Sequence, residues 1–175
     1  MTKHSFAQHD NNKGFSLLET VVALGILVVG IGGAVGLVAQ SLASIEAIKN
    51  KVISANLAQE GIEVVRNLRD ENWLNDVHWR GEGGGILLAN GDYRVQYNAT
   101  ALTSFTDTFL QTNSSGYYGY NNEYGYLGGS DTVFKRKITI SMISDTQIKV
   151  ISWVDWTEKG RVKFIEIEDR LYNWK

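Results

Sequence analysis

One carboxylate stands at the start of a long apolar segment near the N-terminus. The stretch from Lys13 to Glu19 reads Lys-Gly-Phe-Ser-Leu-Leu-Glu, and residues 20 to 45 contain no Asp, Glu, Lys or Arg. A carboxylate drawn to the centre of a lipid bilayer costs about 2.5–3.5 kcal/mol, so an acidic residue at the edge of such a segment indicates a functional role. The chemistry available to Glu19 is ion pairing, and its partner has to be identified.

Side chains for enzymatic chemistry are scarce. The chain has no cysteine, which excludes disulfides, thiolate nucleophiles and cysteine-based zinc sites. Beyond His4 and His9, the remaining histidine is His78, next to Trp79, and we expect the nearby Asp76 and Glu82 to be solvated surface residues. No Ser-His-Asp spacing and no phosphate-binding loop is found. We therefore expect a protein that is not an enzyme, with no cofactor and no metal site.

Length and composition set the outer limits. A chain of 175 residues has room for one globular domain plus an anchor. The net charge of −2 gives no reason to expect nucleic acid as a partner. Without disulfides, the globular part must be stabilised by packing, and the 5 Trp, 8 Tyr and 6 Phe are the expected contributors.

The apolar segment is long enough to span a membrane. At about 1.5 Å per residue, a helix from Val21 to Ala39 covers roughly 28 Å, close to the bilayer hydrocarbon thickness of about 30 Å. Lys3 and Lys13 precede the segment, and the first charge after it is Glu46. The positive-inside rule then predicts a single-pass protein of the cytoplasmic membrane, with its N-terminus in the cytoplasm and its C-terminal domain outside.

Two simpler interpretations compete with a specialised segment. One is a secretory signal peptide cleaved near Ser41 or Ser44, but signal sequences have apolar cores of about 7–15 residues and need no acidic residue at the start. The other is a plain, uncleaved anchor.

The Lys13–Glu19 stretch resembles the processing site of type IV prepilins and of their relatives, the pseudopilins. This resemblance implies that a prepilin peptidase cuts between Gly14 and Phe15, removes the leader 1–14 and methylates the new Phe15 amine. It also implies that Glu19 acts in assembly, with the amine of a neighbouring subunit as its partner. The residue types suit these roles, because glycine gives close backbone access and a new ammonium supplies the missing cation.

A single helix is expected from Phe15 to about Asp70, with a transmembrane and assembly part at 15–41 and an amphipathic part at 42–72. Glycines in the first part predict either close helix packing or a segment that melts in a fibre. The amphipathic part predicts the side-chain pairs Glu63–Arg66 and Arg66–Asp70. Its apolar stripe at steps of three and four consists of Ile45, Ile48, Val52, Ala55, Ala58, Ile62, Val65 and Leu68.

Residues 73–175 predict an antiparallel β domain whose sheet covers this stripe, so the expected fold class is α+β, the pilin-like arrangement. Alternation indicates strands near 91–99, at 138–142, at 148–154 and from 161 to about 167. The Tyr/Gly-rich loop 113–129 predicts either a long irregular insertion, which we favour, or a contact surface.

The resemblance implies a structural subunit of a type IV pilus-like fibre, with a minor pilin as the favoured type. The implied partners are prepilin peptidase, other pilin subunits through the N-terminal helix, and an inner-membrane assembly platform. After assembly, the subunit would lie in a fibre at the cell surface or in the periplasm.

The alternatives are a pseudopilin of a type II secretion or DNA-uptake machine, and a membrane-tethered surface binding domain that does not polymerise. The chain departs from many pilins in lacking both a C-terminal disulfide and a proline in the apolar helix.

Overall fold

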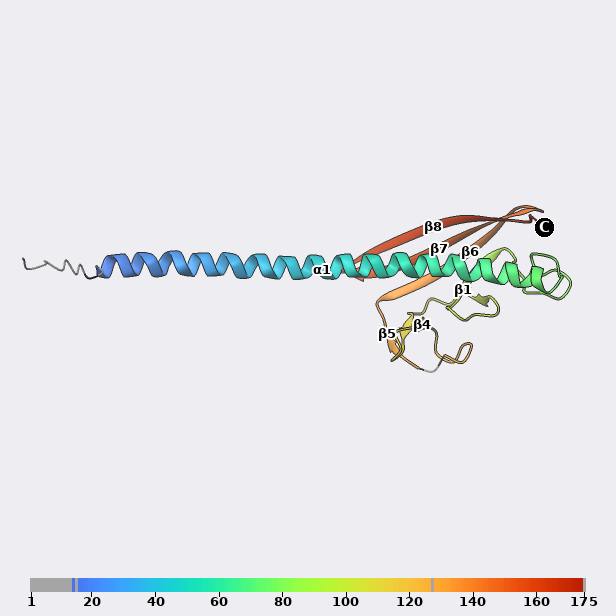
Figure 1. Cartoon of the computed structure of the whole chain (residues 1–175), viewed down its shortest axis with the longest axis horizontal. Coiled ribbons are helices and arrows are strands. Elements are labelled where there is room, and N and C mark those ends of the chain that lie inside the picture. Colours follow the sequence, from blue (N-terminus) through green and yellow to red (C-terminus); the bar gives the residue numbers. More distant parts are fainter. Residues whose placement is uncertain (1–13, 15, 127, 175) are drawn as a thin grey trace, which may run out of the picture. The chain divides into compact units, whose positions relative to one another are not determined.

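The computed structural model describes residue 14 and residues 16–126 and 128–174 (Figure 1). The leader residues 1–13 and Phe15 lie outside the described residues. The chain divides into two units, one that ends at Ile45 and one formed by Glu46–Lys175. Each unit is described by itself below.

The predicted long helix is α1, Leu17–Leu74. It extends one turn beyond its expected end at Asp70 and stops in a Schellman motif. In this motif the Val77 N–H donates to the Asn72 carbonyl at 3.1 Å, and the Asp76 N–H donates to the Trp73 carbonyl at 3.2 Å. Asp76 adopts the left-handed conformation, with φ 54°, at the position that glycine usually takes.

Three long antiparallel strands form the body of the Glu46–Lys175 unit: β6 (Phe134–Ser144), β7 (Gln147–Glu158) and β8 (Arg161–Tyr172). They confirm the three predicted C-terminal strands, and each is longer than predicted. The sheet has the order β2-β1-β6-β7-β8. Lys159 and Gly160 join β7 to β8 with positive φ at both positions, as a tight type I′ hairpin turn requires. The α+β fold with an antiparallel sheet is therefore confirmed.

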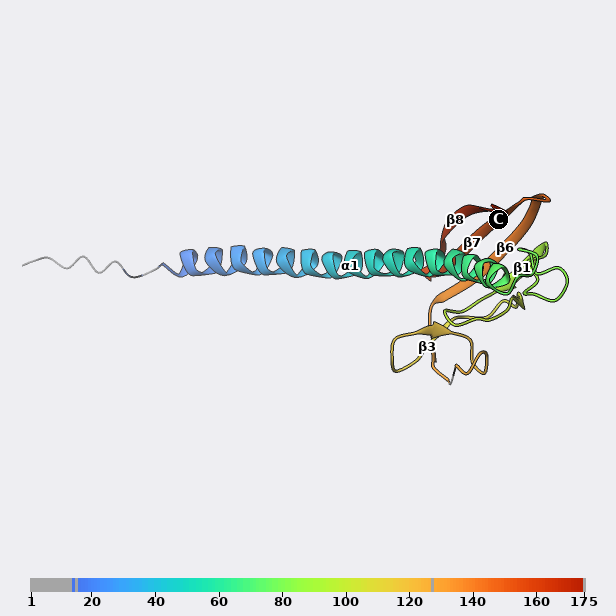
Figure 2. The ribbon, with the colours of Figure 1, turned by 45° about the vertical axis from the view of Figure 1, so that its right-hand side comes forward.

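The helix residues from Ser54 onward pack on one face of this sheet, and α1 runs beside β6, β7 and β8 in both views (Figures 1 and 2). The helix approaches the sheet closely at Gly61, where an added Cβ would lie 2.7 Å from both Ile138 Cδ1 and Ser152 Oγ. The buried residues of α1 are Ser54, Leu57, Ala58, Gly61, Ile62, Val64, Val65, Leu68, Arg69, Asn72 and Trp73.

The predicted stripe is wrong at its beginning. Ile48 and Val52 are 62% and 53% exposed, and Ile45, in the other unit, is 58% exposed. The first fully buried apolar helix residues are Leu57 and Ala58, which pack with Phe134, Val154 and Trp156 near the ends of β6 and β7. Burial therefore begins where the sheet begins to cover the helix, although the apolar period itself starts earlier.

A buried guanidinium group on the sheet forms hydrogen bonds with the helix. The Arg136 side chain has no exposed area, and it donates to the Leu57 carbonyl at 2.9 Å, to Glu60 Oε1 at 2.8 Å and to the Val95 carbonyl. Arg66 pairs with Glu63, as predicted, but its second carboxylate is Asp169 on β8 at 2.7 Å. The predicted partner Asp70 instead forms a salt bridge with Arg69 at 2.8 Å.

The remaining strands are short: β1 (Gly91–Arg94), β2 (Thr103–Ser104), β3 (Gln111–Thr112), β4 (Tyr118–Gly119) and β5 (Ser130–Asp131). The last three form a separate sheet of order β4-β3-β5. The predicted strand near 91–99 ends at Arg94, because the following chain turns away and the Gln96 side chain accepts the Tyr120 N–H at 2.8 Å.

The predicted insertion at 113–129 is mostly irregular in its described residues, and the short strand β4 lies inside it. Tyr120 and Tyr126 are buried, and the Tyr126 hydroxyl donates to the Gln111 carbonyl at 2.9 Å. In both views this segment lies on the side of α1 opposite β8 (Figures 1 and 2). The Tyr126 hydroxyl thus ties the insertion to β3, and the Tyr120 hydroxyl, which donates to the Arg136 carbonyl at 3.3 Å, ties it to β6.

Candidate processing and assembly site

The helix begins directly after the predicted cleavage point. Ser16 caps it, since the Ser16 hydroxyl accepts the Leu18 N–H at 3.3 Å and the Ser16 carbonyl accepts the Thr20 N–H at 3.1 Å. Gly14 is exposed and outside the helix. Gly14 is thus not part of α1.

Glu19 lies in the first turn of α1. Its position suits the positive end of the helix dipole, and Ser16 with Glu19 has the spacing of a capping box. Glu19 is exposed, and among the described residues no cation lies within ion-pair distance of it. The local structure explains why an acidic residue is tolerated here, but the described chain supplies no ion-pair partner.

The segment from Leu17 to Ile45 has apolar side chains around its circumference, and the described part of the chain leaves most of them exposed. Leu17, Val29 and Leu37 are 83%, 76% and 69% exposed. An 18-residue window of α1 has a mean hydropathy of 2.6, and none of that window is buried inside the protein. By length and composition this helix can cross a membrane. A helix that is apolar all round is stable only inside a lipid phase or a bundle of other apolar helices.

The same segment contains five glycines, and no contact with the described residues requires a glycine at these positions. A Cβ added at Gly25, Gly32 or Gly36 would meet nothing within 4 Å. These three glycines are spaced by seven and four residues, so they lie on one face of the helix. A face of small residues lets apolar helices approach closely. The helix is continuous through all of them.

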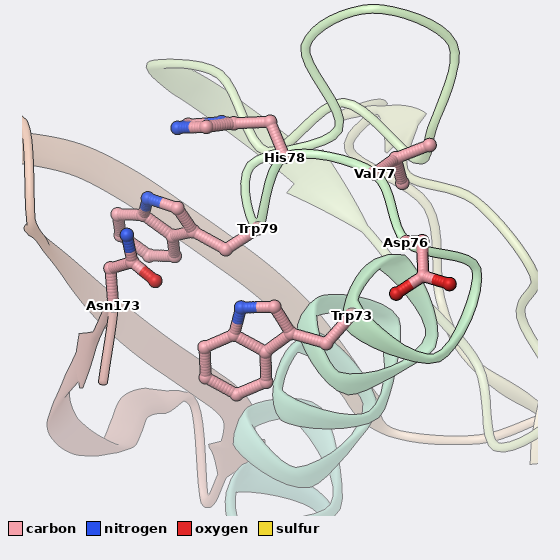
Figure 3. A pocket seen from close by; sticks show the side chains of 6 residues that line it. All are labelled: Trp73, Asp76, Val77, His78, Trp79 and Asn173. Carbon is pink, nitrogen blue, oxygen red and sulfur yellow. The ribbon is translucent and has the colours of Figure 1, made fainter. Parts of the chain in front are cut away.

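Sequence analysis did not predict a second site, a hollow at the C-terminal end of α1 (Figure 3). It brings together Trp73 and Asp76 from the helix end, His78 and Trp79 from the following loop, and Asn173 from beyond β8. Asp76, which the sequence predicts to be a solvated surface residue, is exposed, and so is His78. No local pattern in the sequence signals the hollow, because Asn173 is remote in the chain from the other residues that line it.

Residues that could hold a metal ion were also sought. The described part of the chain contains no group of three or more His, Cys, Asp or Glu side chains placed to bind one.

Comparison with known proteins identifies the N-terminal region. The family described as the prokaryotic N-terminal methylation motif matches residues 9–35. No curated protein and no solved structure matches the chain. The matched segment contains Gly14, Phe15, Glu19 and much of the exposed apolar helix. Together with the long helix on an antiparallel sheet, this N-terminal motif supports a type IV pilin-like prepilin.

Proposed function

We propose that the protein is a structural subunit, of the minor type, in a type IV pilus-like fibre. In this proposal prepilin peptidase cuts between Gly14 and Phe15, the Phe15 amine is methylated, and the subunit assembles through the helix that begins at Leu17. The subunit first spans the cytoplasmic membrane once, with its N-terminus in the cytoplasm. Its chemistry is carried out on it by another enzyme, and it is not itself an enzyme.

One observation carries this proposal. The helix from Leu17 to Ile45 exposes apolar side chains around its whole circumference, and the methylation motif stands at its start. In this proposal the lipid of the membrane buries these apolar side chains before assembly, and the helices of neighbouring subunits bury them afterwards. The small-residue face at Gly25, Gly32 and Gly36 suits such helix packing.

Glu19 gives this packing its register. Four residues along a helix correspond to about 6 Å of rise, so the Glu19 carboxylate and its own Phe15 amine are separated along the helix axis. A neighbouring subunit shifted along the fibre axis can bring its amine to this carboxylate. In an apolar surrounding, a subunit docked at the wrong height would leave two unpaired charges, which is strongly unfavourable.

The mature N-terminus tests the processing step. We expect mass spectrometry of protein from the native host to show a chain that begins at methylated Phe15. An intact Met1, or a start near Ser41 or Ser44, would show an uncleaved anchor or a secretory signal peptide. A pseudopilin of a type II secretion or DNA-uptake machine predicts the same N-terminus, so the location of the fibre must separate that alternative.

The Glu19→Ala variant tests the docking step. We expect normal cleavage and membrane insertion but at least a tenfold loss of the subunit from sheared fibres, measured by immunoblotting against the membrane fraction. Glu46→Ala is the matched control, because Glu46 is also an exposed glutamate on α1 but lies beyond the apolar segment. Normal incorporation of Glu19→Ala would refute the docking role. A failure of both variants to enter fibres would point to a general defect of the helix.

A further inference from the structure

Four exposed cations gather where the β7–β8 hairpin lies beside α1. Lys51 of α1 and Lys163 of β8 line one groove with a volume of about 350 Å³. Lys159 lies in the tight turn between the two strands, and Arg161 begins β8. All four residues are exposed, and we call them the hairpin cations. The fibre function proposed above uses none of them.

The hairpin cations form no ion pair with any carboxylate among the described residues. Elsewhere in the same unit, Arg66 and Arg136 are held by carboxylates at 2.7 and 2.8 Å. Glu158 also lines the groove, but neither Lys51 nor Lys163 is within ion-pair distance of it. This end of the domain therefore carries a net positive charge, which favours an anionic partner.

Apolar side chains at the same end are open to solvent. Ile48 and Val52 of α1 are 62% and 53% exposed, and Val162 and Phe164 of β8 are 67% and 55% exposed. Ile48 and Phe164 line the groove together with the two lysines. Exposed apolar side chains flanked by Lys and Arg are typical of surfaces that lie at a membrane interface. There the apolar groups enter the boundary between headgroups and acyl chains, and the cations contact anionic headgroups.

The place of Lys51 in the sequence keeps it close to the apolar segment. Residues 20–45 carry no charge, and Lys51 follows six residues after that run. Six residues correspond to about 9 Å of helix rise. The headgroup region extends about 5–8 Å beyond the hydrocarbon core of a bilayer, and an anionic surface attracts cations over about another 8–10 Å. A chain anchored by its apolar segment thus holds Lys51 within reach of lipid headgroups.

We propose that this end of the domain binds the anionic phospholipid surface of the membrane before assembly. Lipid phosphates lie against Lys51 and Lys163 in the groove, while Lys159 and Arg161 contact neighbouring headgroups. The exposed Phe164 ring enters the boundary below them. Such binding rests on the membrane anchor of the proposed function but does not require fibre assembly. It holds the domain on the membrane until the subunit leaves for a fibre.

The test uses the full-length chain in vesicles, either of neutral phosphatidylcholine or of an equal mixture with anionic phosphatidylglycerol. The chain has no cysteine, so Thr157→Cys can carry a single fluorophore at an exposed residue beside the hairpin turn. A nitroxide on the lipid headgroups quenches the fluorophore when the hairpin lies on the membrane. We expect at least twofold stronger quenching in anionic vesicles, and the difference should vanish in high salt. With the fluorophore at Asp145→Cys, between β6 and β7, we expect no difference.

A double variant locates the binding. Each cation near an anionic surface strengthens binding roughly fivefold. Lys51→Gln with Lys163→Gln is therefore expected to lower the ratio of docked to free domains at least tenfold, with the unfolding temperature unchanged. Lys149→Gln is the matched control, because Lys149 also lacks an ion pair among the described residues but lies in the other half of β7, opposite Arg170. It is expected to dock as the unaltered chain does.

Alkaline extraction of the same vesicles separates this proposal from the anchor. A chain that stays in the bilayer but is quenched equally in neutral and anionic vesicles would overturn the proposal, leave the anchor intact and assign the groove to a protein partner. A chain that is extracted would contradict the anchor and, with it, this binding.

Two further results would also refute the proposal. One is an equal loss of docking in Lys149→Gln and in the double variant, which would reduce the effect to net charge. The other is release of the hairpin by inorganic phosphate where chloride of the same ionic strength has no effect, which would make the groove a site for free phosphate.

Discussion

Leu57, Val65 and Leu68 in the second half of α1 are at most 3% exposed, whereas Leu17, Val29 and Leu37 in the first half are 69% exposed or more. Both halves belong to one continuous helix, and both are rich in apolar residues. The second half finds its partner in the sheet of its own chain. The first half has no such partner among the described residues, which agrees with the proposed burial of its apolar surface in lipid or against other subunits.

Glycines show the same difference. Gly61 is required by the fold, because any Cβ there would press on Ile138 and Ser152. Gly25, Gly32 and Gly36 lie in open space. Each costs about 1 kcal/mol of helix propensity relative to alanine, without a compensating contact inside the described chain. Their benefit has to come from neighbours outside the chain.

The carboxylates complete the comparison. Glu60 is paired with a guanidinium that is entirely buried, at 2.8 Å. Glu19 is exposed and has no ion-pair partner within the described residues. An internal pair holds the domain together, and a carboxylate without an internal partner is available to a second molecule. Substitutions of Arg136 and Gly61 test this contrast.

Arg136→Met is expected to have the largest effect. It removes the donor to Glu60 and to the carbonyls of Leu57 and Val95, which leaves buried acceptors unpaired. Breaking such a network costs about 3–5 kcal/mol, so chemical denaturation should show a marked fall in the free energy of unfolding. Lys137→Met, at the next position on the opposite face of β6, should change it by less than about 0.5 kcal/mol. Equal effects of the two would contradict the role given to Arg136.

Gly61→Ala is expected to cost about 1–3 kcal/mol, because the new methyl group overpacks the contact with Ile138 and Ser152. Gly36→Ala is the matched change in the other half of α1 and should leave the unfolding of the Glu46–Lys175 unit unaltered. Its effect should appear instead as weaker incorporation into fibres. If Gly36→Ala destabilised this unit as much as Gly61→Ala, the division of the helix into two differently supported halves would be wrong.

Asp155→Asn is expected to have the smallest effect. Burial raises the pKa of the Asp155 carboxyl, and the nearby Lys135 opposes this shift. The folded protein thus binds the proton more tightly than the unfolded chain does, so stability decreases as the pH rises from the unfolded pKa through the raised one. Asn removes this loss. Thermal unfolding near neutral pH should show a slight rise in midpoint, and the difference from the unaltered chain should vanish in acid; a lower midpoint at neutral pH would contradict the burial effect.

Local patterns predicted much of this architecture. The charge-free run, the three-to-four period and the strand alternation each depend on neighbours in sequence, and they gave the long helix, the anchor and the three long strands. The same reasoning misplaced the start of the buried stripe, because burial of Ile48 and Val52 depends on where β6, β7 and β8 end in space. It also missed Asp169 as the partner of Arg66, since the two are far apart in the chain.

The candidate sites differ in the same way. The motif from Lys13 to Glu19 is contiguous, so it could be recognised in the sequence by its resemblance to prepilin processing sites, and the family match confirms the motif. The hollow around Trp73, Asp76 and Trp79 needs Asn173 from the far end of the chain. Only the helix end and the path of β8 bring these residues together.

By itself the sequence determined a prepilin-type motif, a membrane-length apolar helix and an antiparallel domain. Each of these follows from the order of adjacent residues or from the spacing of apolar residues along the chain. The tertiary structure decided which helix residues the sheet covers, which charges are paired inside the chain, and that the aromatic residues at the two ends of the β domain share one surface. These features depend on distances between segments that are remote in sequence, and no local pattern encodes such distances.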